Sequence, residues 1–354
     1  MIIQPRRFNP RKTLTVSIVL LVAFYYAHWR DSRPSLWELR GKTMGTTYSI
    51  KIFDRSLSKG KAMELQSDID TLLLEVNRQM STYVADSEIN QFNQHTSMDP
   101  FPVSSGFSET FALARSLCEA TGGAFNPTLD KLINAWGFGP EGAGKQPTEE
   151  QISNALAVVS CEVISLDDQR RLVKHNPDAT LNLNAIAKGW GVDEVARLIE
   201  SRGITNLFVE IGGEIVARGI SDKLRPWRVG VDRPVDDALP GEQYDLIVSI
   251  DRKGMATSGN YRNYFIDESG QRYAHILDPR NGRPSSTSLA SITVIATNCA
   301  TADALATGLF VMGTEAGLAW VNARDDIHAA FIDHAPDGSL KTSFSKGFEA
   351  YVVK

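Results

Sequence analysis

Residues 207–219 read LFVEIGGEIVARG, and this stretch decides the fold class. Two apolar runs flank Gly212 and Gly213, and two glycines between such runs predict a strand, a tight turn and a second strand. Other strand and helix patterns lie irregularly on both sides of this hairpin, without a repeated strand–helix–strand unit. We therefore predict an α+β fold: a single mixed domain of antiparallel sheets flanked by helices, covering residues 38–354.

Hydrophobic periodicity predicts the elements around this hairpin. Tyr48, Ile50 and Ile52 alternate with polar residues and indicate a half-buried strand. Helices are expected after Lys61 as far as Met80, over Phe107–Leu117, from a capping box at Thr148–Gln151, over Ala185–Ser201, and over 300–312 and 315–323. Further strands are expected near 163–166, 171–174, 227–231, 245–251, 289–296, 328–333 and 349–353.

Composition limits the class of partner. The chain has 354 residues, a formal net charge of −5 and no long basic stripe. Binding to phosphate backbones needs clustered Lys and Arg, so nucleic acid is excluded as the main partner.

The three cysteines, Cys118, Cys161 and Cys299, lie far apart in the sequence. An odd number cannot form a complete disulfide framework, and no C-x-x-C pair suggests zinc or redox chemistry. We expect them to be small buried apolar residues rather than catalytic thiols.

The N-terminus has the pattern of an export signal or signal anchor. A basic head over residues 1–12 precedes an uncharged segment, so residues 13–29 are expected to be a membrane anchor or signal, and 30–37 a linker. No small-x-small cleavage site follows Ala27, which favours an uncleaved anchor. The basic head is expected to stay in the cytoplasm, with the following domain on the other side of the membrane.

Two glycine-rich matches are rejected. Gly137, Gly139 and Gly142 satisfy G-x-G-x-x-G, but a dinucleotide loop must follow a strand, whereas a helical pattern precedes these glycines. Gly139–Lys145 spells G-x-x-x-x-G-K, but Gln146 replaces the Ser or Thr that holds magnesium in such loops. Both matches are expected to be chance products of a turn.

The stretch 298–313, NCATADALATGLFVMG, predicts an almost wholly apolar helix. Asp303 and Thr307 are four residues apart and therefore share one face. One interpretation is that Asp303 caps its own helix or favours the positive N-terminal end of it. The other is that the carboxylate and hydroxyl hold a hard cation such as magnesium, with phosphate oxygens completing its coordination.

The stretch 182–199, NLNAIAKGWGVDEVARLI, begins a helix with small residues at alternate positions, Ala185, Ala187, Gly189 and Gly191. A ligand or another backbone can approach such a bare surface closely. Lys188 would then meet a phosphate near the helix start. The alternative is tight helix packing with a solvated lysine.

Two polar turns, ATSGNYRNY (256–264) and YAHILDPRNGRP (273–284), surround a histidine. His275 is expected in a short apolar strand beside Asp278. A lone histidine in such a place is more often a structural residue. A histidine near a carboxylate is also what proton transfer to or from a hydroxyl requires.

Together these strings resemble the FAD:protein FMN transferase family, also called the ApbE family. The resemblance runs from GKTMGTTYSIKI (41–52) to NCATADALATGLFVMG. Between them lie MSTY (80–83), GGAFNPTLDKLINAWGFGP (122–140) and the strings quoted above. It implies an ApbE-like α+β domain that binds FAD and Mg²⁺, transfers FMN to a Thr or Ser of an acceptor protein and releases AMP.

The resemblance also implies roles for individual residues. Asp303 and Thr307 match the metal ligands, with the backbone carbonyl of Ala185 as a further ligand, and Asp303 and His275 are the expected catalytic residues. The expected contacts to FAD are Met44, Tyr83, Ala124, Phe125, Asn126, Asn182, Lys188 and Leu277. Asn126 and Asn182 stand where many members have Asp, which argues against extra acids at these two positions.

The implied partner is an acceptor protein with a Thr or Ser flavinylation motif, expected in a membrane redox complex. The implied location is the bacterial inner membrane, with the catalytic domain in the periplasm. Two alternative functions are open: an extracytoplasmic FAD-binding protein without chemistry, and an FAD pyrophosphatase in which water replaces the acceptor hydroxyl.

Overall fold

The computed structural model describes residues 34–353, except 141, 143, 145, 236–240, 261–263 and 268–269. The predicted cytoplasmic head, the membrane anchor and most of the predicted linker lie outside the described residues. Strand β1 begins at Ser35, inside the segment expected to be linker, so that expectation is wrong for residues 35–37.

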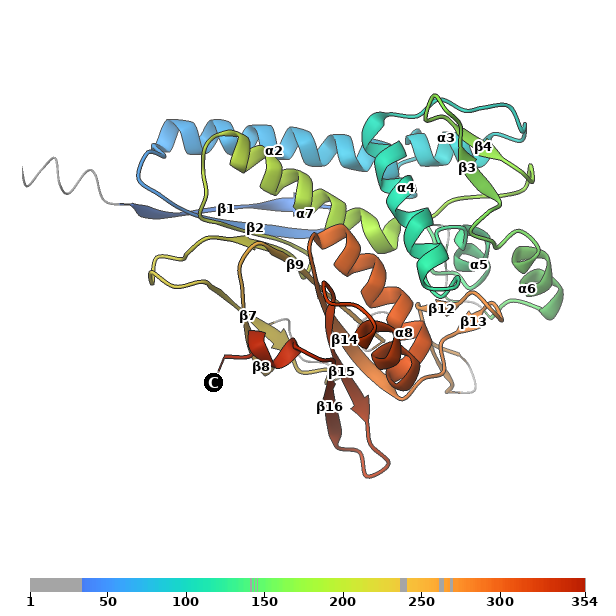
Figure 1. The fold of residues 1–354 in the computed structure, drawn as a ribbon. Helices are drawn as coiled ribbons and strands as arrows, with labels where there is room; N and C mark the ends of the chain where they lie inside the picture. The colour runs from blue at the N-terminus through green and yellow to red at the C-terminus, as the bar shows by residue number, and fades with distance from the viewer. Residues whose placement is uncertain are drawn as a thin grey trace, which may run out of the picture.

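An eight-stranded antiparallel sheet forms the centre of the molecule (Figure 1). Its order is β1-β2-β5-β6-β9-β14-β15-β16. The bounds are β1 Ser35–Thr43, β2 Thr46–Asp54, β5 Leu207–Ile211, β6 Glu214–Arg218, β9 Lys253–Gly259, β14 Leu289–Ala296, β15 His328–His334 and β16 Leu340–Phe344. The predicted hairpin is confirmed, because β5 and β6 pair antiparallel across Gly212–Gly213 with Ile211 opposite Glu214.

Three long helices, α2 Lys59–Met80, α7 Asn184–Ser201 and α8 Cys299–Asn322, cover one face of this sheet (Figure 1). The other face packs against a two-stranded ribbon, β7 Trp227–Asp232 with β8 Tyr244–Ile250, and against a short 3-10 helix, η1 Phe348–Tyr351. The core is therefore double: an aliphatic layer lies under the helices and a smaller layer, around Trp227 and Phe348, lies under the ribbon.

Helix α8 is the main core helix. Of the helices in the described residues, it alone is long and apolar enough to cross a bilayer, but half of its most apolar window is buried within the protein, against β9 and β14. Its residue Gly313 has a non-helical φ of 76°, which separates the two predicted helical segments. The helices predicted over 300–312 and 315–323 are separated at this glycine.

A second group of elements, which we call the outer lobe, lies at one end of α2 and α7 (Figure 1). It consists of α3 Glu88–Gln94, α4 Ser105–Ala120, α5 Asp130–Ala135, α6 Glu149–Leu156, β3 Ile164–Leu166 and β4 Leu172–Lys174. The capping box predicted at Thr148 is confirmed, since the Thr148 and Gln151 side chains each accept from the other residue's backbone amide.

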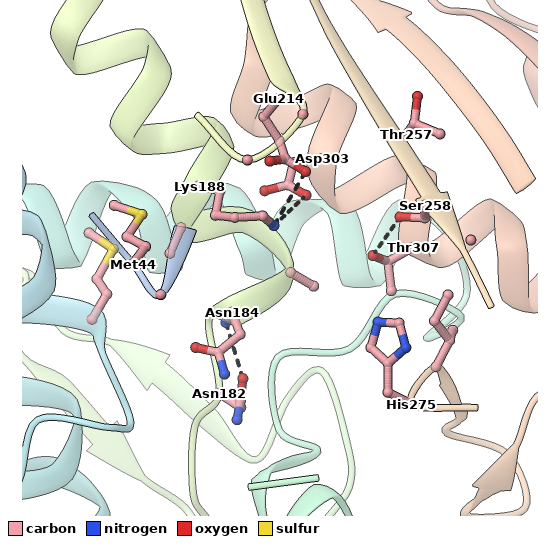
Figure 2. A pocket seen from close by; sticks show the side chains of 18 of the residues that line it. Met44, Asn182, Asn184, Lys188, Glu214, Thr257, Ser258, His275, Asp303 and Thr307 are labelled. Atoms are coloured by element: carbon pink, nitrogen blue, oxygen red, sulfur yellow. Dashed lines mark hydrogen bonds and ion pairs between the residues drawn. The ribbon is translucent and has the colours of Figure 1, made fainter. Parts of the chain in front are cut away.

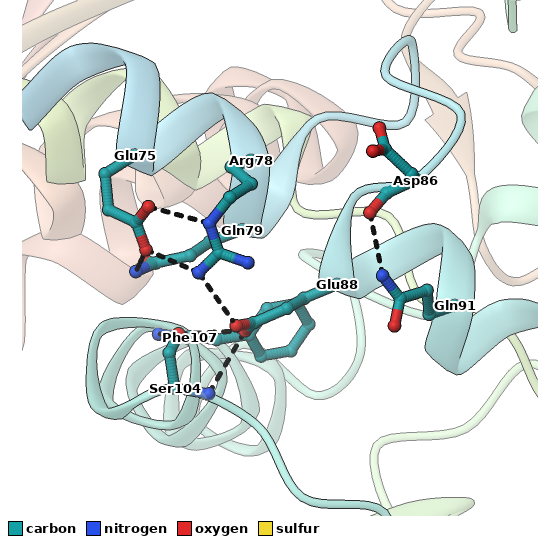
Figure 3. A network of polar contacts seen from close by, with 8 residues as sticks. All are labelled: Glu75, Arg78, Gln79, Asp86, Glu88, Gln91, Ser104 and Phe107. Atoms are coloured by element: carbon teal, nitrogen blue, oxygen red, sulfur yellow. Dashed lines mark hydrogen bonds and ion pairs between the residues drawn. The ribbon is translucent and has the colours of Figure 1, made fainter. Parts of the chain in front are cut away.

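A polar network joins α2 to the outer lobe (Figure 3). Arg78 at the end of α2 pairs with Glu75 and, at 3.2 Å, with Glu88 of α3. The other oxygen of Glu88 accepts from the amide and the hydroxyl of Ser104, the N-cap of α4. The Glu88 carboxylate thus links the C-terminal end of α2 to α3 and α4.

Cys118 and Cys161 form a disulfide between the end of α4 and the segment after α6, with their Cα atoms 5.7 Å apart. The expectation that all cysteines are unpaired apolar residues is therefore wrong for these two. An odd number prevents full pairing but not the pairing of two, and the fold brings together residues 43 positions apart. Cys299 is buried and unpaired, as expected.

Two minor hairpins complete the fold: β10 Tyr264–Ile266 with β11 Arg272–Ala274, and β12 Leu277–Asp278 with β13 Arg283–Pro284. The strand expected near 349–353 is wrong, because this segment is mostly the 3-10 helix η1, with a single bridge from Val352 to Val248. The edge strand β16 was not predicted.

Candidate active site

One cavity of about 970 Å³ opens where the C-terminal end of α2, the start of α7, the middle of α8 and the β5–β6 turn meet. All twelve residues predicted for the site lie along its wall, although they come from positions 44 to 307 of the chain. They are Met44, Tyr83, Ala124, Phe125, Asn126, Asn182, Ala185, Lys188, His275, Leu277, Asp303 and Thr307. Their individual roles remain predictions.

Three charged side chains form what we call the charged wall of the cavity (Figure 2). Lys188 of α7 places its Nζ 3.3 Å from Glu214 Oε1 and 3.7 Å from Asp303 Oδ1. Both carboxylate side chains are only 5% exposed, whereas the Lys188 side chain is 29% exposed and faces the cavity. Two buried carboxylates thus share one ammonium group.

The electrostatics of this wall follow from burial and charge proximity. Burial raises the pKa of Glu214 well above its usual range, and the Asp303 carboxylate raises it further, against the opposing effect of Lys188. Burial alone would lower the pKa of Lys188, but Asp303 and Glu214 outweigh it and hold that pKa above its ordinary value. Lys188 is therefore a fixed positive charge at neutral pH.

The charged wall depends on a close crossing of α7 and α8. A Cβ atom added to Gly189 would lie 2.5 Å from the carbonyl oxygen of Cys299, so only glycine permits this approach. The Gly189 amide donates to Asp303 Oδ2 at 3.0 Å, although the Ala185 carbonyl is its ordinary helical acceptor. Packing therefore explains Gly189, while Ala185 and Lys188 line the cavity beside it.

Asp303 does not cap its own helix, so the capping interpretation is wrong. The N-terminus of α8 is capped by Asn298, whose side chain accepts from the Thr301 amide, and by Asp193 of α7, which accepts from the amides of Cys299 and Ala300 at 2.9 Å. Asp303 lies one turn later and points toward α7 and the cavity.

Thr307 lies one turn beyond Asp303 on the same face of α8, as predicted. Its hydroxyl is 3.4 Å from the hydroxyl of Ser258 on β9 (Figure 2). Carboxylate, hydroxyl and carbonyl oxygens, from Asp303, Thr307 and Ala185, thus lie along the same cavity.

Amide side chains form the floor near the start of α7. Asn182 accepts from the Asn184 amide and donates to Asp130 Oδ1 at 3.2 Å, and burial raises the pKa of Asp130. Asn126 accepts from the amide and hydroxyl of Thr128, which holds the loop after α4. At Asn126 and Asn182, where many members of the resembled family have Asp, the side-chain amide therefore takes part in local hydrogen bonds.

His275 lies on the cavity wall below Thr307 in the view of Figure 2. Its ring packs edge-on against Phe138, with centroids 6.4 Å apart. The prediction that His275 itself lies in a strand is wrong. His275 follows β11, and Asp278 accepts from the Arg280 guanidinium at 2.7 and 2.8 Å.

The mouth of the cavity carries Met44 and Tyr83. Met44 and Gly45 form the tight β1–β2 turn, both in the left-handed region with φ of 48° and 70°. Tyr83 is 64% exposed and its hydroxyl donates to the carbonyl of Phe138 at 3.4 Å. The mouth is thus bordered by two side chains able to contact a flat ring.

Phe138, Asn184, Glu214 and Ser258 are among the lining residues that the sequence-based prediction did not include. Phe138 lies within the rejected G-x-G-x-x-G match, and the sequence around Ser258 predicts only a turn. A signal for Glu214 was present, because a charged residue directly after a glycine turn interrupts an otherwise apolar hairpin.

The model of the ApbE family matches residues 44–331. This chain belongs to the ApbE family. An FAD:protein FMN transferase of Vibrio cholerae is 42% identical over 318 residues, covering 89% of this chain and 92% of the relative. One of Haemophilus influenzae is 39% identical, covering 88% and 90%. The prediction of a flavin-transferring enzyme of this ApbE class is thereby confirmed.

Solved structures agree with the ApbE assignment. The flavin transferase ApbE from Vibrio cholerae matches with a TM-score of 0.81 at 41% identity, covering 90% of this chain and 99% of that chain. The apo form of Pseudomonas stutzeri flavinyl transferase ApbE matches with a TM-score of 0.80 at 34% identity, covering 90% and 97%. The predicted α+β architecture is therefore that of known ApbE proteins.

Proposed function

We propose that this chain transfers the FMN half of FAD to a Thr or Ser hydroxyl of an acceptor protein and releases AMP. The observation that carries the proposal is the pairing, in one cavity, of the charged wall with apolar and aromatic surface from Met44, Phe125, Phe138 and Leu277. FAD has the matching shape, with a charged pyrophosphate between two flat rings. A cavity of about 970 Å³ is large enough for a ligand of this class.

The oxygen donors of the cavity fit magnesium. Within the described residues, no three His, Cys, Asp or Glu side chains gather into a metal site. The proposed donors are instead the Asp303 carboxylate, the Thr307 hydroxyl and the Ala185 carbonyl, and Mg²⁺ needs few protein ligands when phosphate oxygens supply the rest. When bound, Mg²⁺ would neutralise negative charge on the pyrophosphate.

The chain's own residues then perform two tasks. Lys188 pairs with the pyrophosphate, and the apolar wall orients the flavin so that its phosphorus faces the acceptor. The acceptor oxygen forms a bond to that phosphorus, the bond to the AMP oxygen breaks, and the hydroxyl proton passes to His275. Positioning and charge stabilisation dominate phosphoryl-type transfer.

The direct test uses the purified protein with FAD, Mg²⁺ and a candidate acceptor, and the acceptor is weighed by mass spectrometry. We expect a mass gain equal to FMN minus water, with AMP in solution. Free FMN and AMP with an unlabelled acceptor would identify a pyrophosphatase. Intact FAD after long incubation would identify a binding protein.

His275→Ala tests the proposed proton transfer. We expect the rate of transfer to fall by about 100-fold, the contribution typical of a general base, while the Kd for FAD changes little. Stopped-flow transfer assays and fluorescence titration of FAD separate the two quantities. A normal rate would remove this role from His275.

We further propose that the domain lies outside the cytoplasm, held at the bacterial inner membrane by the N-terminal segment, and acts on a subunit of a membrane redox complex. The Cys118–Cys161 disulfide supports this location, because such bonds persist mainly in oxidising compartments. Alkaline phosphatase fused after Lys354 should be active in cells. An inactive but intact fusion would contradict the location.

A further inference from the structure

Glu214 has a carboxylate oxygen that the fold does not satisfy. Oε1 pairs with Lys188 at 3.3 Å, but Oε2 is buried and has no hydrogen-bond partner among the residues that the structure describes. The side chain is 5% exposed, so bulk water does not replace the missing donor. A buried acceptor without a donor costs free energy, which favours a donor supplied by a molecule that enters the cavity.

The position of Glu214 gives a ligand access to this oxygen. Glu214 is the first residue of β6 and directly follows the Gly212–Gly213 turn, and all three residues line the cavity. A Cβ atom added to Gly212 would lie 3.5 Å from Glu214 Oε2. The Thr46 side chain lies nearer to that position, with Cγ2 at 2.8 Å and Oγ1 at 3.3 Å, so a bound molecule reaches the oxygen from the cavity side, between the glycine turn and Thr46.

The chemistry of the ligand limits which of its groups can donate a hydrogen bond to Glu214 Oε2. Lys188 joins Glu214 to Asp303, so a phosphate paired with Lys188 lies next to Glu214. A pyrophosphate diester carries no proton at neutral pH and only accepts hydrogen bonds. The nearest donors on such a ligand are the hydroxyls of the carbon chain or sugar attached to each phosphate.

We infer that Glu214 is a substrate-binding residue whose Oε2 accepts a hydrogen bond from a hydroxyl adjacent to the pyrophosphate of FAD. This inference rests on the proposed function. The hydroxyl belongs either to the ribityl chain of the FMN half or to the ribose of the AMP half. Glu214 would then recognise a hydroxyl group of the nucleotide, whereas Lys188 recognises only the charge of its phosphates.

Glu210 supplies a matched control on the same hairpin. Its Oε1 accepts from the Gly213 amide at 2.7 Å, and the residue is absent from the cavity wall. Glu210→Gln therefore changes a carboxylate that serves only the turn. Loss of affinity in Glu214 variants but not in Glu210→Gln separates ligand contact from hairpin stability.

The test measures dissociation constants of the full-length protein by calorimetry at fixed Mg²⁺, for FAD, FMN, ADP and inorganic pyrophosphate. Glu214→Ala should weaken FAD binding about 10-fold and leave pyrophosphate, which has no hydroxyl, unchanged. A parallel loss for FMN but not ADP assigns the ribityl chain, and the reverse assigns the ribose. Should the alanine variant fail to fold, Glu214→Gln keeps the shape, and we expect it to weaken FAD about 3-fold.

Two results would overturn the inference. One is unchanged FAD affinity in both Glu214 variants. The other is an equal loss for all four ligands, pyrophosphate included, which would mean that Glu214 acts only by holding Lys188. A wild-type protein that does not bind FAD would instead defeat the proposed function itself.

Discussion

Two lysines within this fold, Lys188 on the charged wall and Lys174 in the outer lobe, have opposite surroundings. Lys188 is shared by two carboxylates, which raise its pKa against the effect of burial. Lys174 is 1% exposed; its Nζ donates to the Asn93 carbonyl at 3.4 Å and lies 4.8 Å above the Phe92 ring. Burial, with repulsion from Lys131, lowers the pKa of Lys174 to about 8.

The difference separates a binding charge from a structural one. At Lys188 the fold buries two carboxylates and one ammonium beside a cavity, and an incoming cation balances this excess of negative charge. At Lys174 the side chain packs between α3 and β4, and the residue does not line the cavity. Buried ions with strongly perturbed pKa values therefore mark function here only where they also border a cavity.

Removing Asp303 should break the charged wall most severely. Asp303→Ala deletes the carboxylate that contacts Lys188, the Gly189 amide and the proposed magnesium. We expect flavin transfer to fall by about 1000-fold or more, as for loss of a central electrostatic group. Mass spectrometry of the acceptor measures the rate and circular dichroism checks the fold; a folded variant with wild-type transfer would refute the assignment.

Neutralising each lysine in turn tests the comparison directly. Lys188→Met should weaken FAD binding by about 10- to 100-fold, because a charge-assisted contact to phosphate is lost. Lys174→Met should leave the Kd for FAD unchanged, because its ammonium does not reach the cavity. Fluorescence titration of both variants provides the measurement, and equal effects would show that the two regions are not distinct.

Removing the disulfide tests whether this one bond of the outer lobe contributes stability rather than binding. Cys118→Ser with Cys161→Ser should lower the free energy of unfolding by about 2–4 kcal/mol, since the bond closes a long loop. The Kd for FAD should change less than about 3-fold. Urea denaturation and FAD titration measure the two effects. A large loss of affinity at wild-type stability would contradict this division of roles.

The smallest expected effect is the pH dependence set by Lys174. Its folded pKa of about 8 lies below the unfolded value of about 10.5, so between these two values the unfolded chain binds more protons and stability rises with pH. Below pH 8 the buried charge lowers stability fully. Lys174→Met should therefore be more stable than wild type at pH 7, by about 1–2 kcal/mol.

This advantage should shrink as the pH rises from 8 to 10.5. Urea denaturation of wild type and Lys174→Met across that window measures the difference in the free energy of unfolding. Parallel profiles for the two proteins would show that Lys174 does not titrate there.

Features with a local cause were predictable from the sequence. The Gly212–Gly213 hairpin, the capping box at Thr148 and the break at Gly313 each depend on a few neighbouring residues and their backbone preferences. The gathering of the site residues was expected only because the family strings were present. Periodicity alone does not show that Met44 and Thr307 border one cavity.

Features set by distant contacts were not predictable. The edge strands β1 and β16 pair on one side only and carry many polar residues, so their alternation is weak. The Cys118–Cys161 bond depends on where two loops meet. The apolar run before Lys354 looked like a strand, but Phe348 is drawn into the core under β15 instead. A role for Glu214 in the site can be inferred only from its contact with Lys188, which also pairs with Asp303.

The contact at Gly189 has a consequence for how this enzyme can change. The separation between Lys188 and Asp303 is set by two main chains in touch, not by exchangeable side chains, so point substitutions have little means of widening or narrowing it. Variants selected to accept altered flavins should therefore keep this pair of helices intact and accumulate their substitutions on the opposite, apolar side, around Met44, Phe125 and Leu277.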